Sequence, residues 1–110
     1  MEERLSPETE TNLYRITQEA MNNIMKYARA TRVDVLLERR DHQVVLIIED
    51  NGIGFDLKKA ELDDEGLGLT GMRERAAQIG GTVEVESKEK EGTTIFARVP
   101  VKFLEEGEGK

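Results

Sequence analysis

The sequence of 110 residues contains no cysteine and no tryptophan, and it has a single histidine. Without cysteine there is no disulfide framework and no thiol chemistry, which fits a reduced, cytoplasmic compartment. No apolar run approaches the length of a membrane span, and the N-terminus lacks a signal-peptide pattern. We therefore expect a cytoplasmic piece of chain that makes no membrane contact itself, whether or not its parent is membrane-anchored.

Negative charge outweighs positive charge, because 16 Lys and Arg stand against 23 Asp and Glu, a formal net charge of -7. Affinity for nucleic acid comes largely from Lys and Arg on phosphates, so this balance argues against DNA or RNA as the main partner. The length supports one domain with one modest core, and no internal repeat is present. We predict a single domain over residues 1–110, with a disordered tail at 104–110.

Two amphipathic helices are predicted. The first has Ser6 as N-cap and Pro7 at its first position, and its apolar spacing continues to about Ala28. The second begins near Thr70, and the Gly80-Gly81 pair stops it.

Four strands are predicted around these helices. Residues 31–40 alternate, and "VVLIIED" (44–50) is a continuous apolar run typical of a central buried strand. "TVEVES" (82–87) and "TTIFARVPV" (93–101) alternate on either side of "KEKEG", which predicts a hairpin. The order α-β-β-α-β-β predicts an α/β fold, a two-layer sandwich with helices on one face of a mixed sheet.

The stretch "GLGLTG" (66–71) spells G-x-G-x-x-G, the fingerprint of a dinucleotide-binding turn. That fingerprint must follow an apolar strand, and here it follows "ELDDE", whose charges would repel a pyrophosphate. A second glycine cluster, with Asp50, Gly52 and Gly54, ends the central strand. Two such elements around one acidic loop suggest backbone that approaches a ligand closely, the alternative being a flexible loop.

Polar residues form a stripe on the first helix. Glu19, Asn23, Lys26 and Tyr27 fall at i, i+4, i+7 and i+8, whereas Asn22 points about 100° away from Asn23. A carboxylate and an amide oxygen one turn apart suit Mg²⁺, and a lysine one turn on suits a phosphate. The alternative is a solvated polar edge.

Together these motifs resemble the ATP-binding catalytic domain of sensor histidine kinases, in the Bergerat-fold superfamily that includes gyrase, mismatch-repair and heat-shock chaperone ATPases. "EAMNNIMKYA" resembles the N box, and "DNGIGFD" the first glycine box. "GLGLTGMRERA" resembles the second glycine box of kinases that pair with nitrate/quorum-type response regulators, and "GTTIFARVP" the closing strand. Many relatives carry His where Tyr27 stands, and the aromatic ring is kept.

The resemblance implies ATP and Mg²⁺ as ligands, and it implies a role for each site residue. Asp50 would accept a hydrogen bond from the adenine amino group, and Thr93 would share a water with both; Thr94 should face the other way in its strand. Glu19 and Asn23 are the implied metal ligands and catalytic residues. The other implied nucleotide contacts are Lys26 on a phosphate, Tyr27 and the glycines Gly52 and Gly54 at the base, and backbone N–H groups of Gly66, Leu67, Gly68 and Leu69 on the phosphates, at the end of a lid over 55–69.

The resemblance also implies partners. The phosphoacceptor of such kinases is a histidine on a separate helical dimerisation domain, with a response regulator downstream. The single histidine, His42, lies in a polar turn between two strands and is expected to be a plain surface residue. We therefore expect a fragment of a longer kinase, monomeric by itself. A serine kinase of the anti-sigma type, an ATP-gated clamp or chaperone, and an inactive nucleotide-binding module are the alternatives.

Overall fold

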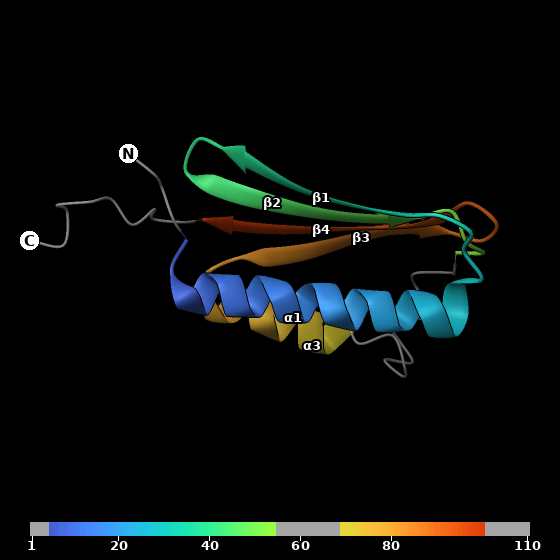
Figure 1. Cartoon of the computed structure of the whole chain (residues 1–110), viewed down its shortest axis with the longest axis horizontal. Helices are drawn as coiled ribbons and strands as arrows, with labels where there is room; N and C mark the ends of the chain where they lie inside the picture. Colours follow the sequence, from blue (N-terminus) through green and yellow to red (C-terminus); the bar gives the residue numbers. More distant parts are fainter. Residues whose placement is uncertain (1–4, 55–68, 101–110) are drawn as a thin grey trace, which may run out of the picture.

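The computed structural model of the chain describes residues 5–54 and 69–100, which form two layers (Figure 1). Both α-helices lie on the same face of a four-stranded sheet. The elements in chain order are α1 (Pro7–Asn23), η1 (Ile24–Ala28), β1 (Val33–Arg40), β2 (Gln43–Asp50), α3 (Leu69–Gln78), β3 (Thr82–Lys88) and β4 (Gly92–Pro100). The two-layer α/β sandwich with helices on one face is confirmed.

The start of α1 follows from its first residues. Ser6 is extended, and its hydroxyl oxygen accepts a hydrogen bond from the Thr9 N–H at 3.2 Å. Pro7 occupies the first turn, where its missing N–H costs nothing, and two glutamates in that turn complement the helix dipole. The predicted N-terminus is confirmed.

All three strand pairings among the described residues are antiparallel, in the order β1-β2-β4-β3. The expectation of a mixed sheet is therefore corrected. The physical reason is the position of β4, which pairs with β2 on one side and β3 on the other. β2 and β3 run parallel to each other, but β4 lies between them, so no parallel ladder forms.

The core lies between the helices and one face of the sheet. Apolar side chains recur at helical spacing on α1 and α3 and at every second position on the strands. These residues include Leu13, Ile16 and Ala20 of α1, Met72 and Ala76 of α3, Val44, Leu46 and Ile48 of β2, Val83 and Val85 of β3, and Ile95, Ala97 and Val99 of β4. The packing fixes where α1 lies against the sheet, and so fixes the polar residues along its edge.

The edge strand β1 is less covered than its neighbours. By register, Val35 lies opposite Ile48 and Leu37 opposite Leu46, both on the helix-facing side. Val35 and Leu37 are nevertheless 48% and 57% exposed. The helix layer thus covers β2, β4 and β3 and leaves Val35 and Leu37 of β1 largely open, while Val33 packs against the edge of the core.

The end of α3 is set by the two glycines that the sequence analysis placed there. Gly80 has φ +77°, a left-handed conformation that disfavours side chains, and the Gly81 N–H donates to the Ala76 carbonyl at 2.7 Å. In the part of the chain that the structure describes, no helix has the length and apolar character needed to cross a bilayer.

Candidate functional site

Three connections meet at one end of the sheet (Figure 1). They are the segment after η1, the segment after β2, and the turn between β3 and β4. The Ile53 N–H donates to the Ala28 carbonyl at 2.8 Å, and the Ile53 carbonyl accepts from the Lys90 N–H. The segment after β2 is therefore bonded to both of the others, and the predicted site residues Asp50, Gly52 and Gly54 lie within or beside it.

Asp50 is the buried carboxylate of this end. It is only 5% exposed, and its Oδ1 accepts a hydrogen bond from the Gly52 N–H at 2.8 Å. Burying a carboxylate costs free energy unless it is hydrogen-bonded, and the Gly52 N–H supplies one such bond. The expectation that Asp50 is not an exposed strand-end residue is confirmed.

The two glycines after Asp50 have a packing reason. A Cβ on Gly52 would overlap the carbonyl oxygen of Ala28, at the end of η1. Gly54 has φ +63°, and a Cβ there would overlap the carbonyl oxygen of Lys88. Their lack of side chains is thus required by close approach of the chain to itself. The structure gives this reason for both glycines, while their contact with a base stays a prediction.

Thr93 faces the same side of the sheet as Asp50, because the two are paired across β2 and β4. Its hydroxyl lies 2.7 Å from the hydroxyl of Ser87, which also donates to the Gly92 carbonyl at 3.2 Å. Ser87 was not among the predicted site residues. The alternation Val83, Val85, Ser87 in "TVEVES" was the signal that placed it on this face.

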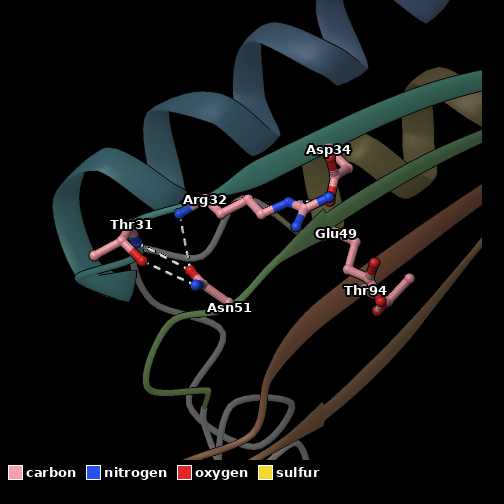
Figure 2. A network of polar contacts seen from close by, with 6 residues as sticks. All are labelled: Thr31, Arg32, Asp34, Glu49, Asn51 and Thr94. Atoms are coloured by element: carbon pink, nitrogen blue, oxygen red, sulfur yellow. Dashed lines mark hydrogen bonds and ion pairs between the residues drawn. The ribbon is translucent and has the colours of Figure 1, made fainter.

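Thr94 points to the opposite face, as predicted. Its hydroxyl donates to Glu49 Oε2 at 3.5 Å on the outer side of the sheet (Figure 2). Thr93 and Thr94 are therefore adjacent in sequence and on opposite faces of the sheet.

Glu19 of α1 faces the start of α3. A Cβ built on Gly71 would lie 3.5 Å from Glu19 Oε2 and 3.7 Å from Oε1. Because Gly71 is in the first turn of α3, the half-buried carboxylate lies beside the N-terminal end of that helix, where the dipole favours negative charge. The structure thus brings together one residue of the first helix and the last glycine of "GLGLTG".

The next residues of the polar stripe require a correction. Asn23 is half-buried and ends α1, whereas Asn22 is exposed, so the two asparagines differ as expected. Lys26, which is exposed, and Tyr27 lie in η1, a π-helical turn. A π turn holds more residues than an α turn, so the α-helical register applies to Glu19 and Asn23 and does not extend to the other two.

Other predicted residues lie outside the described part. These are Gly66, Leu67 and Gly68, nearly all of the lid over 55–69, and the tail at 104–110. Leu69 is described, and it begins α3 with a side chain 4% exposed in the core. A contact of Leu69 with phosphate would therefore use its backbone.

His42 is exposed, as expected, and it lies in the turn between β1 and β2. This turn is at the opposite end of β2 from Asp50. Eight residues of β2 at about 3.3 Å each separate the two ends by roughly 25 Å.

The side-chain oxygens of Glu19 and Asn23 suit an open magnesium site better than a site enclosed by protein ligands. Within residues 5–54 and 69–100, no group of three or more His, Asp or Glu side chains converges on one point. Glu19 and Asn23 offer two oxygen donors one turn apart. Mg²⁺ typically takes one or two protein oxygens and completes its shell with waters and phosphates, so these two residues fit it.

A family model described as "Histidine kinase-, DNA gyrase B-, and HSP90-like ATPase" matches residues 8–102. The chain is 41% identical over 101 residues to the signal transduction histidine-protein kinase/phosphatase DegS of Bacillus subtilis, covering 91% of this chain and 26% of DegS. It is 40% identical over 106 residues to the sensor histidine kinase LiaS of the same organism, covering 96% of this chain and 29% of LiaS. The chain thus spans little more than a quarter of these relatives.

Solved structures also superpose on this chain. The ATP binding domain of PrrB from Mycobacterium tuberculosis superposes with a TM-score of 0.72 at 26% identity, covering 84% of this chain and 68% of that one. The mycobacterial sensor histidine kinase MprB superposes with a TM-score of 0.69 at 25% identity, covering 86% and 73%.

Proposed function

The chain belongs to the family of histidine kinase-, DNA gyrase B- and HSP90-like ATPases, and from this premise we propose that it is the catalytic domain of a two-component sensor histidine kinase. In this proposal it binds ATP with Mg²⁺ and donates the γ-phosphate to a histidine on a separate helical dimerisation domain. The observation that carries the proposal is the buried Asp50 carboxylate, which lies beside Thr93 on the helix-facing side of the sheet.

The base end of the site is assigned to Asp50 and its neighbours. Asp50 accepts a hydrogen bond from the adenine amino group with the carboxylate that it buries at the end of β2. Thr93 is held by Ser87, and its hydroxyl completes a water-mediated contact to the same amino group. The backbone of Gly52 and Gly54 passes against the base in this proposal, and Tyr27 of η1 lines the base pocket.

The phosphate end is assigned to α1 and the start of α3. Glu19 and Asn23 hold Mg²⁺, which neutralises charge on the phosphates when it is bound. The exposed Lys26 contacts a phosphate, and the backbone N–H groups of residues 66–69 cradle the phosphates at the end of α3 that favours anions. Catalysis in this chemistry consists mostly of positioning and charge neutralisation, with Glu19 polarising the attacking group.

The phosphoacceptor is proposed to lie on another domain. The only histidine of this sequence is His42, which lies at the far end of β2 from Asp50. The proposed partners are therefore the helical dimerisation domain and, after it, a response regulator. We propose that the domain acts in the cytoplasm and is monomeric by itself.

Nucleotide selectivity tests the proposal. We expect the domain to bind ATP and ADP in the presence of Mg²⁺, and to bind GTP at least about tenfold more weakly, because guanine places a carbonyl oxygen where adenine places its amino group. Two acceptors then face each other at Asp50. Isothermal titration calorimetry measures both affinities, and equal affinity for ATP and GTP would reject the assignment of Asp50.

Thr93 and Thr94 form a matched pair of variants that tests the proposed water-mediated contact of Thr93. Thr93→Val should weaken ATP binding by about 0.5–1.5 kcal/mol, roughly two- to twelvefold in Kd, the net value of one hydrogen bond. Ser87 keeps its bond to the Gly92 carbonyl in this variant. Thr94→Val removes the same hydroxyl from the outer face and should leave the affinity unchanged. If Thr94→Val has the larger effect on ATP affinity, the face of the sheet has been misassigned.

A further inference from the structure

Asn51, the residue directly after β2, makes four hydrogen bonds to one dipeptide, Thr31-Arg32. Its Oδ1 accepts from the Thr31 N–H and from the Arg32 N–H, each at 2.9 Å, and its Nδ2 donates to Thr31 Oγ1 at 2.9 Å (Figure 2). The Asn51 backbone N–H also donates to the Arg32 carbonyl at 3.2 Å. The side chain and the backbone of one residue therefore hold the same short segment.

That segment is the connection between η1 and β1. η1 ends at Ala28, Arg29 follows in a left-handed conformation with φ 52°, and β1 begins at Val33. The Thr31 and Arg32 N–H groups thus lie outside both elements, so neither a helix nor a strand ladder supplies their acceptors. Asn51 supplies the acceptor from a position 20 residues further along the chain.

The residues on either side of Asn51 are also held by hydrogen bonds. Before it, Asp50 accepts the Gly52 N–H through Oδ1; after it, the Ile53 N–H donates to Ala28, the last residue of η1. Asn51 and Ile53 therefore fasten the end of η1 and its exit loop to the end of β2. Together with the packing of α1 against the sheet, these bonds hold the end of η1 beside the Asp50 turn.

We propose that Asn51 is a positioning residue for nucleotide binding, which fixes the end of the first helix against the Asp50 turn without touching the ligand. This inference rests on the proposed ATP-binding function. Asn51 does not itself read the base, because both ends of its amide are committed to Thr31 and Arg32. Its contribution is to hold the residues of η1 and Asp50 at the separation that one nucleotide requires.

The chemistry of the side chain makes the proposal specific. An aspartate at this position keeps a carboxylate oxygen for the two N–H groups, and its second oxygen accepts the Thr31 hydroxyl, which then becomes the donor. An alanine keeps none of the side-chain bonds, although the backbone bond from residue 51 to the Arg32 carbonyl remains. The conservative variant should therefore restore what the truncation loses.

The experiment compares ATP affinity and thermal unfolding in Asn51→Ala, Asn51→Asp and the wild-type domain. We expect Asn51→Ala to bind ATP roughly tenfold more weakly, within the usual range for coupling between two parts of a site, and Asn51→Asp to stay within about twofold of wild type. Asp34→Ala breaks the exposed Arg32–Asp34 ion pair beside the same loop and should leave affinity unchanged.

A second control separates positioning from general stability. Ile79→Val trims a partly buried side chain directly after α3, which should lower the unfolding temperature without moving the first helix or Asp50. If Asn51 contributes only stability, Ile79→Val with a matched loss of unfolding temperature should weaken ATP binding as much as Asn51→Ala. Positioning predicts that only Asn51→Ala does so.

The outcomes distinguish this inference from the function on which it rests. No ATP binding by the wild-type domain would remove the proposed function itself. Wild-type binding together with unchanged affinity in a folded Asn51→Ala, or equal losses in the alanine and aspartate variants, would overturn the role of Asn51 alone. If Asn51→Ala fails to fold, Thr31→Val, which removes only the hydroxyl partner, carries the test: weakened ATP affinity supports positioning, and wild-type affinity overturns it.

Discussion

Asp50→Asn should weaken ATP binding by about 1–3 kcal/mol, roughly 5- to 150-fold in Kd, while the domain remains folded. The loss is expected because the amide presents a weaker, neutral acceptor to the adenine amino group, and its own NH₂ opposes that group in the other orientation. The fold should survive because the amide oxygen can still accept the Gly52 N–H that Asp50 accepts at 2.8 Å. Calorimetry gives the affinity, and thermal unfolding gives the stability.

The neighbouring carboxylate is the matched control for Asp50. Glu49 is exposed and bonds Thr94 on the outer face of the sheet, so Glu49→Gln makes the same chemical change one residue away and on the other side. It should leave ATP affinity unchanged. Equal affinity in wild type and Asp50→Asn would mean that the nucleotide binds elsewhere.

The sequence predicted the local features of this fold well, because each is determined by neighbouring residues. Ser6 and Pro7 act within the first turn of α1, and the opposite directions of Thr93 and Thr94 follow from strand alternation alone. Burial of Asp50 was also predictable, because the carboxylate ends a continuous apolar run. These signals need no knowledge of how distant segments pack.

The features that the sequence did not predict depend on contacts between distant segments. Gly52 has to be glycine because Ala28, 24 positions earlier, approaches it closely, and no local pattern records that approach. The bond from Asn51 to Thr31 is of the same kind. The π turn of η1 was missed because "IMKYA" is too short for its periodicity to separate a π turn from an α turn.

The antiparallel sheet illustrates a related limit. The two hairpins, β1–β2 and β3–β4, followed from the polar turns between alternating strands. The sequence did not show whether β3 or β4 would pair with β2, because the hydrophobic pattern allows either order. The buried faces of β2, β3 and β4 fit the same helix layer in both arrangements, so strand order is a tertiary property here.

The largest expected effect concerns phosphoryl transfer. Alone, the domain should show at most slow ATP hydrolysis and no stable self-phosphorylation, because a histidine has to be brought in line with the γ-phosphate. The only histidine of the sequence, His42, lies in the exposed turn between β1 and β2, outside the proposed site. Mixed with the helical domain of its parent kinase, it should transfer phosphate to that domain's histidine. The reaction should be slow, since separate pieces lack the effective concentration that a linker supplies.

Substitutions in the first helix should greatly lower the rate of this phosphoryl transfer. Glu19→Ala should lower its rate by about 10²–10³, the usual cost of losing one group that stabilises charge in the transition state. Asn23→Ala should abolish the dependence of nucleotide binding on Mg²⁺, because it removes one of the two proposed ligands. Asn22→Ala is the matched control: the same truncation at an exposed neighbour should change little. The opposite ranking of the two asparagines would show that the metal lies on another face of the helix.

The chemical stability of the label decides among the alternative functions. Radiolabelled ATP is incubated with the domain alone, with the domain and the helical domain, and with the Glu19→Ala domain and the helical domain. Acid-labile label on the helical domain, lost in Glu19→Ala, is the expected result for a histidine kinase. Acid-labile label on the domain incubated alone would assign the acceptor role to His42 and contradict the expectation that it is a plain surface residue. Acid-stable label on a serine of an added antagonist protein would favour the anti-sigma type of kinase, because phosphoserine survives acid whereas phosphohistidine does not.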